Sequence, residues 1–124
     1  MSKRFLVDTH VLLWFWHGDP RISAAHVGIL QSEAEIFCSM ASLWEIAIKV
    51  GRGKLKTVDR PHESLAETGI TILPIEVAHV EAVGRLAPHQ ADPFDRMLVA
   101  QAIVEGMTIL TADDAIRRYE VAVA

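Results

Sequence analysis

The chain has 124 residues, a net charge of −4 and a hydrophobic content of 51%. This length predicts one globular domain over residues 1–124 with a sizeable core. The acidic balance argues against a broadly basic nucleic-acid-binding face. The single cysteine, Cys38, excludes an intrachain disulfide and fits a reducing compartment. With no secretory signal and no apolar run of the ~18 residues that a membrane span needs, we expect a cytoplasmic protein that makes no membrane contact.

Short apolar runs alternate with longer segments of helical spacing. In chain order, the sequence predicts a strand at residues 4–8, helices at 9–16 and 22–33, a strand at 35–39, helices at 40–51 and 62–68, a strand at 70–74, helices at 76–86 and 93–105, a strand at 107–111, a helix at 112–119 and a candidate fifth edge strand at 121–124. Ser23 is a predicted N-cap, and Asp92 with Pro93 forms the N-cap and first position of a helix that Gly106 ends.

The order of these elements indicates the fold class. Strands alternate with helices, and the strands are continuous runs of Val, Ile and Leu, with no two-residue alternation. Such runs are typical of a parallel sheet with helices on both faces, so we expect an α/β fold. In such sheets, ligands bind beyond the carboxyl ends of the strands.

Four acidic residues stand where apolar segments begin or end: Asp8, Glu45, Asp95 and Asp113. Asp8 and Asp113 fall at or just past the carboxyl ends of the first and fourth predicted strands. If the fold gathers the four, they form a set of hard oxygen ligands suited to Mg²⁺ or Mn²⁺ and to phosphodiester hydrolysis. If it does not, they are separate helix caps and surface charges.

Asp8 and Glu45 each have a structural interpretation beside the functional one. Asp8 is placed to cap the helix that follows it, although a carboxylate ending a buried strand is costly without a partner. Glu45 has Lys49 four residues later, a spacing that gives an ion pair on a solvent face. From Lys49 to Arg60 the chain is rich in basic residues, which indicates either a strip that contacts phosphates or a solvated loop.

The other two acids are equally open. Asp95 lies three residues after Asp92, where an acidic side chain bonds back to the N-cap amide. Its helix continues with apolar neighbours, which favours burial. Asp113 and Asp114 both suit the N-terminus of the predicted last helix, so the sequence alone does not decide which of them serves a site.

Four segments together resemble the PIN domains, in particular the VapC-type toxins of bacterial toxin–antitoxin pairs. They are LVDTHVLLW at residues 6–14, SLWEIAIKVGRGKL at 42–55, DPFDRMLVAQA at 92–102 and LTADDAIRRY at 110–119. The resemblance spans nearly the whole chain, and the combination of WEIAIK with DPFDR is highly specific.

The resemblance implies a three-layer α/β/α fold around a parallel sheet of strand order 3-2-1-4-5. It implies an endoribonuclease that hydrolyses RNA with a water activated by Mg²⁺, for which Mn²⁺ can substitute. The family's acidic positions fall on Asp8, Glu45, Asp95 and Asp113, and its hydroxyl falls on Thr111. Asp114 is adjacent and leaves open which carboxylate completes the site.

The resemblance also implies partners. VapC-type toxins are usually homodimers, and a cognate antitoxin blocks each of them. The apolar run from Val11 to Trp16 holds enough large side chains to line a groove or a dimer contact as well as a core. We expect Lys49 and Arg52 to contact phosphates of the RNA.

Two alternatives come from other classes of protein. A phospho-acceptor receiver domain has a similar length and sheet, but it needs an acceptor aspartate after the third strand, where this chain has Leu73-Pro74-Ile75-Glu76. A binding module with the PIN fold and no catalysis is the second alternative, and the intact set of four acids argues against it.

Overall fold

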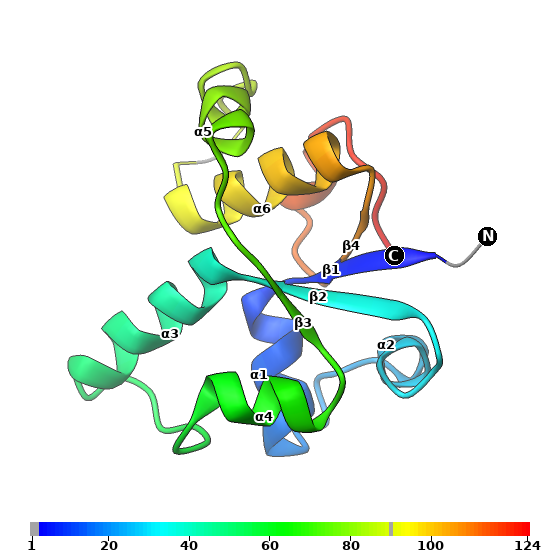
Figure 1. Cartoon of the computed structure of the whole chain (residues 1–124), viewed down its shortest axis with the longest axis vertical. Helices are drawn as coiled ribbons and strands as arrows, with labels where there is room; N and C mark the ends of the chain where they lie inside the picture. Colours follow the sequence, from blue (N-terminus) through cyan, green and yellow to red (C-terminus); the bar gives the residue numbers. More distant parts are fainter. Residues whose placement is uncertain (1–2, 90) are drawn as a thin grey trace.

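A parallel sheet forms the centre of the molecule (Figure 1). The computed structural model describes residues 3–89 and 91–124. Within these residues the sheet has four strands in the order β3-β2-β1-β4. The strands are β1 (Arg4–Val7), β2 (Glu35–Ser39), β3 (Thr71–Leu73) and β4 (Thr108–Leu110). In register, Val7 of β1 pairs with Cys38 of β2 and Leu110 of β4.

Helices cover both faces of this sheet. They are α1 (Thr9–His17), α2 (Ala24–Leu30), α3 (Met40–Gly51), α4 (Pro61–Glu67), α5 (Val77–Gly84) and α6 (Pro93–Glu105). Figure 1 shows α1, α2 and α4 on one side of the sheet and α5 and α6 on the other. The predicted three-layer α/β/α architecture is confirmed. No helix among the residues that the structure describes is long and apolar enough to cross a membrane.

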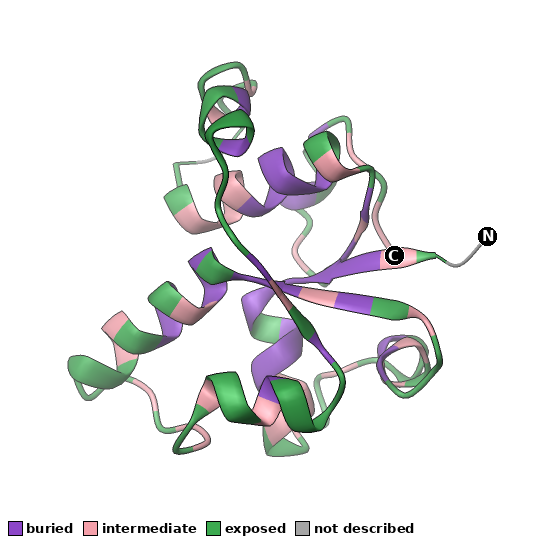
Figure 2. Cartoon of the chain, in the orientation of Figure 1, coloured by how far each residue is buried: buried purple, intermediate pink, exposed green. Residues whose placement is uncertain are grey.

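Two apolar layers hold the helices to the sheet, and β1 contributes to both (Figure 2). Phe5 and Val7 pack with α1 and α2, whereas Leu6 points to the opposite face and packs with α6. This alternation follows from the strand geometry, in which successive side chains point to opposite faces. Because both faces are apolar, the strand reads in the sequence as one continuous hydrophobic run.

The C-terminal segment differs from the prediction in two ways. Residues 121–124 form a single parallel bridge, between Ile109 and Val123, beside β4. They occupy the expected fifth position without forming a full strand. The predicted helix at 112–119 is wrong, since only a 3₁₀ turn forms, η1 (Ile116–Arg118). There the Asp113 side chain accepts a hydrogen bond from the Ala115 amide at 2.9 Å, a local turn that competes with helix formation.

Both ends of α6 carry the predicted signals. The Asp92 side chain accepts hydrogen bonds from the amides of Phe94, at 2.8 Å, and Asp95, at 3.1 Å. Gly106 ends the helix in the left-handed conformation, with φ of 67°. The cap fixes the first turn of α6, and with it the position of Asp95 at the third residue of the helix.

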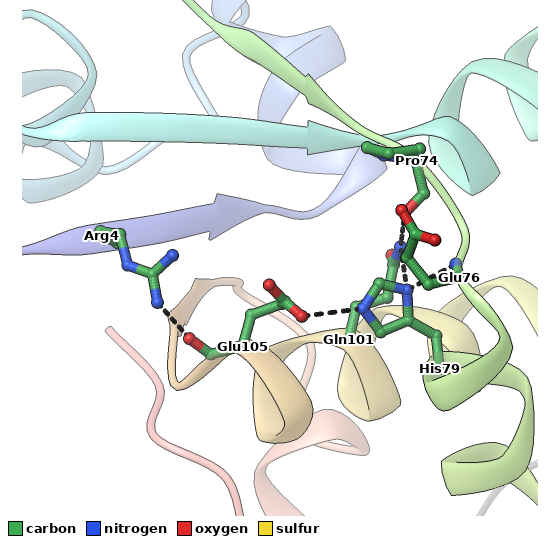
Figure 3. A network of polar contacts seen from close by, with 6 residues as sticks. All are labelled: Arg4, Pro74, Glu76, His79, Gln101 and Glu105. Atoms are coloured by element: carbon green, nitrogen blue, oxygen red, sulfur yellow. Dashed lines mark hydrogen bonds and ion pairs between the residues drawn. The ribbon is translucent and has the colours of Figure 1, made fainter.

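A buried histidine joins α5 to α6 (Figure 3). The Nδ1 atom of His79 accepts a hydrogen bond from the Glu76 amide at 2.9 Å. The neutral ring must therefore carry its proton on Nε2, which lies 3.1 Å from Oε2 of Glu105. The ring thus caps its own helix with one nitrogen and contacts the next helix with the other.

Two further contacts extend this network. The Gln101 side chain of α6 donates to the carbonyl of Pro74 at 3.2 Å, and the Arg4 guanidinium of β1 donates to the carbonyl of Glu105 (Figure 3). Together these bonds link α6 to α5, to β1 and to the segment after β3. The helix that carries Asp95 is therefore held by polar contacts as well as by its apolar face.

We expect His79→Ala to destabilise the protein by about 2–4 kcal/mol, because it opens a cavity and leaves the Glu76 amide without its acceptor. Urea unfolding measures this loss. His62→Ala removes an exposed histidine and should stay within about 0.5 kcal/mol of the wild type. Equal stability of the two variants would contradict the role given to the network.

Candidate active site

Asp8 lies at the carboxyl end of β1 and is only 3% exposed. Its backbone amide donates to the carbonyl of Leu110 at 3.0 Å, which continues the pairing of β1 with β4. Its Oδ1 atom accepts from the Val11 amide at 2.8 Å, so the residue is the N-cap of α1. The capping interpretation of Asp8 is confirmed, and it leaves the second carboxylate oxygen for other contacts.

Thr111 follows β4 and sits between two of the predicted acids. Its hydroxyl donates to Oδ2 of Asp8 and accepts from the Asp113 amide at 2.9 Å. The carboxylate of Asp113 is partly buried at the same end of the sheet. Asp114, in contrast, has a side chain that is 99% exposed and lies 3.9 Å from Arg117. The geometry therefore favours Asp113 over Asp114 as the fourth acid.

Glu45 is 5% exposed, which the interpretation as a solvent-face ion pair did not expect. Its Oε2 atom does pair with Nζ of Lys49, at 3.2 Å. Its Oε1 atom is buried and has no hydrogen-bond partner within residues 3–89 and 91–124. A buried carboxylate oxygen without a partner costs free energy, and a bound cation is one way to satisfy it.

A pair of buried hydroxyls, which the sequence analysis missed, links α1 to α3. Thr9 donates to Oγ of Ser42 at 2.9 Å, and both side chains are buried. Ser42 lies one turn before Glu45 on α3, so the bond holds the helix of Glu45 against the helix that Asp8 caps. A serine three residues before the acid, in an otherwise apolar stretch, is the signal that the sequence offered.

Asp95 is half-buried in the first turn of α6. Burial is the main cause that raises its pKa from 3.8 to about 7, and the charges of Asp92, Asp113, Glu45 and Asp8 add to it. Burial also raises the pKa of Asp8, and Asp113 contributes in the same direction. Asp8, Glu45 and Asp113 thus lie within electrostatic range of Asp95, and Asp113 lies within range of Asp8.

These acids do not form a closed metal site. No group of three or more His, Cys, Asp or Glu side chains lies close enough to hold an ion, as far as the described residues extend. Carboxylates that share a region repel one another unless a cation or a proton lies between them. The donor type fits Mg²⁺ or Mn²⁺, which prefer carboxylate oxygens. The unpartnered oxygen of Glu45 is the observation that supports this fit.

A cleft of about 330 Å³ opens beside the acids and is lined by Asp8, His10, Trp14, Arg21, Ala112 and Asp113. A second cleft of about 300 Å³ includes Lys49 in its wall. Arg52, the other predicted phosphate contact, is exposed at the C-cap of α3. The cleft beside the acids thus offers a substrate access to Asp8 and Asp113.

The chain matches the PIN domain family over residues 5–122 and belongs to that family. Among solved structures it is similar to VapBC2 from Rickettsia felis bound to a DNA fragment from its promoter, with 16% identity and a TM-score of 0.73 over 98% of this chain and 97% of that one. It is also similar to FitAcB from Neisseria gonorrhoeae, with 20% identity and a TM-score of 0.68 over 96% and 95% of the two chains. At these identities the likeness shows the fold alone. A search of curated proteins found no match.

The raised pKa of Asp95 predicts a pH-dependent stability in the absence of metal. Between its ordinary value of 3.8 and the raised value of about 7, the folded protein holds a proton that the unfolded chain has released. Stability should therefore fall as the pH rises through this window and level off above it. Asp95→Asn should flatten the slope in urea titrations in EDTA.

The control for this experiment is Asp114→Asn, since the side chain of Asp114 is 99% exposed. It should keep the slope of the wild type. If Asp95→Asn also keeps that slope, the proton is held by another group.

Proposed function

We propose that this chain is a metal-dependent endoribonuclease that acts as the toxin of a toxin–antitoxin pair. The observations that carry the proposal are that Asp8, Glu45 and Asp113 lie near enough to Asp95 to raise its pKa, and that one buried oxygen of Glu45 has no partner among the described residues. Membership of the PIN family supports it. The receiver-domain alternative is set aside by the same family match.

These four acids would hold Mg²⁺, with Mn²⁺ as a substitute. When bound, the ion supplies a Lewis acid that activates water and neutralises charge on the phosphoryl group. Hydrogen bonds from the Val11 amide and the Thr111 hydroxyl orient the two carboxylate oxygens of Asp8 for this role. The raised pKa of Asp95 favours its protonated form. Because a carboxylate must be ionised to bind a metal, Asp95 would release this proton when the ion binds.

Lys49 is placed between the acids and the second cleft. It neutralises Glu45 through the 3.2 Å ion pair and also lines that cleft. Because the whole chain carries a net charge of −4, an RNA phosphate needs local positive charge to approach the acids. Lys49 and Lys54 both line that cleft and together supply such a charge.

The antitoxin and the homodimer remain part of the proposal and rest on uncovered apolar surface. The run from Val11 to Trp16, which the sequence analysis had considered for this role, packs into or against the core. The apolar surface lies elsewhere, in a cleft of about 750 Å³ between α3 and α4. Trp44 on α3, with 60% exposure, and Val77 on α5, with 74%, are uncovered apolar side chains outside that cleft.

A binding module without catalysis is the second candidate, and the open arrangement of the acids favours it. The two candidates make opposite predictions in an RNA-cleavage assay. Cleavage that requires Mg²⁺ and stops with EDTA supports the nuclease.

Asp8→Asn should lower cleavage by roughly 100-fold or more, beyond the loss typical of a residue that only supports a ligand. Its stability should fall by only about 1 kcal/mol, because asparagine is an equally good N-cap and only the Thr111 hydroxyl loses its acceptor. Asp114→Asn is the matched control, since the change is the same and the side chain is exposed. Equal loss in both variants, or unimpaired cleavage by Asp8→Asn, would remove Asp8 from the site.

Binding of Mg²⁺ should raise the melting temperature of the wild type in the absence of RNA. At a free concentration of about 100 times its Kd, a ligand specific for the folded state adds about 2.7 kcal/mol of stability. We expect a much smaller gain for Asp8→Asn and an unchanged gain for Asp114→Asn, measured by differential scanning fluorimetry. A wild type that does not respond to Mg²⁺ or Mn²⁺ would contradict the assignment of these acids as ligands.

A further inference from the structure

We propose that Arg21 is a stacking platform for an RNA base next to the acidic centre, and that the adjoining cleft takes the neighbouring phosphate against Lys54. The inference rests on the proposed function and names a part of the substrate site that the four acids do not define. Arg21 lies on the loop between α1 and α2, outside the segments that suggested the family.

The guanidinium of Arg21 is held in one orientation. Its central carbon lies 5.1 Å from the centroid of the Trp14 ring, over the face of the indole. Its Nε and Nη2 atoms donate to the carboxylate of Asp19, at 3.1 and 2.7 Å from the nearest oxygens. These hydrogen bonds lower the pKa of Asp19 to about 2, so the pair stays charged at neutral pH.

One edge and one face of the guanidinium are thus occupied, yet the side chain is 69% exposed. Because Trp14 covers one face, a base can reach the guanidinium from the opposite face. A flat guanidinium that two contacts already orient is a surface on which a nucleic-acid base stacks, and little conformational entropy is lost when it does. Asp19 already balances the positive charge of Arg21, so the guanidinium attracts a phosphate only weakly. Its planar face can still stack on a base.

The place of Arg21 in the molecule connects it to the acids. The cleft of about 330 Å³ is lined both by Asp8 and Asp113 and by His10, Trp14 and Arg21. The cleft of about 300 Å³ shares these last three residues, so the two clefts adjoin.

The second cleft continues to Lys49 and Lys54. The two clefts together therefore lead from Asp8 and Asp113, where cleavage is proposed, past Arg21 to the two lysines. Such a combination of stacking surface and positive charge is typical of sites that bind single-stranded nucleic acid. Single-stranded RNA fits better than a duplex, since paired bases are not free to stack on a side chain.

The alternative is a purely structural role, in which the Arg21–Asp19 ion pair only stabilises the turn after α1. The two interpretations differ in what they need from residue 21. Arg21→Lys keeps the positive charge and a partner for Asp19 but removes the planar surface. A structural pair tolerates this change, whereas a stacking platform does not.

The chain offers a matched control in Arg60. Its side chain is 71% exposed and pairs with Glu63 at 3.3 Å, so it resembles Arg21 in both respects. It precedes α4 and lines neither of the two clefts beside the acids. Arg60→Lys should therefore leave RNA binding unchanged, and melting temperatures verify that both variants fold.

The experiment compares a fluorescent hexamer of adenosine nucleotides with the same hexamer lacking its bases. Binding is followed by anisotropy in EDTA, where no cleavage occurs. The wild type should prefer the hexamer with bases by about tenfold, the range of one stacked base. Arg21→Lys should lose this preference while Arg60→Lys keeps it. In Mg²⁺, Arg21→Lys should raise KM by about the same factor with kcat within about twofold.

The other outcomes overturn the inference in distinguishable ways. If the wild type cleaves RNA and Arg21→Lys behaves like it, the nuclease stands and the platform falls. If Arg21→Lys weakens both hexamers equally, Arg21 acts by charge and the platform also falls. If the wild type neither binds nor cleaves RNA, the proposed function fails and the platform with it.

Discussion

The burial of acidic side chains at one edge of a parallel sheet is the constraint on which the rest of this structure depends. Asp8 and Glu45 are almost completely buried, and the charges of Asp8, Glu45 and Asp113 act on Asp95. In a protein interior such charges raise the free energy of the folded state unless hydrogen bonds, protons or cations offset them. The chain supplies hydrogen bonds to Asp8, a lysine to Glu45 and a proton to Asp95. Each compensation is partial, and a divalent ion at this edge would offset the negative charge that remains.

The scaffold around the acids is correspondingly rigid. Each acid either follows a strand or belongs to a helix, and hydrogen bonds hold these strands and helices to their neighbours. Thr111 ties the end of β4 to Asp8, the Thr9–Ser42 pair holds α1 to α3, and the His79 network holds α6 to α5 and β1. Such polar contacts between elements position side chains more narrowly than apolar packing alone, because hydrogen bonds depend on direction as well as distance. These contacts thus tie the helices that carry Glu45 and Asp95 to their neighbours in the fold.

The sequence predicted the architecture well because its apolar runs, its helix caps and its helix terminators all indicated the same elements. Apolar strands, helix caps such as Asp92 and terminators such as Gly106 all indicated the same α/β order, and the strands pair as expected. The last segment failed because the Asp113 side chain forms a local turn that helix periodicity does not reveal. The sequence predicted that Asp8 and Asp113 stand at strand ends, and the resemblance implied that Glu45 and Asp95 join them, but no three of these acids lie close enough to hold an ion among the described residues. Contacts that depend on the fold in three dimensions, such as Thr9 with Ser42 or Arg21 over Trp14, had no comparable signal.

Helix capping and metal binding had looked like competing interpretations of Asp8, but the geometry makes them compatible. An ionised carboxylate has about four lone-pair positions. The Val11 amide uses one on Oδ1 and the Thr111 hydroxyl uses one on Oδ2, which leaves one on each oxygen. The two existing bonds also fix the carboxylate plane, so the remaining lone pairs point in set directions. A cap that orients a carboxylate in this way prepares it to be a ligand, and the same residue serves the fold and the proposed chemistry.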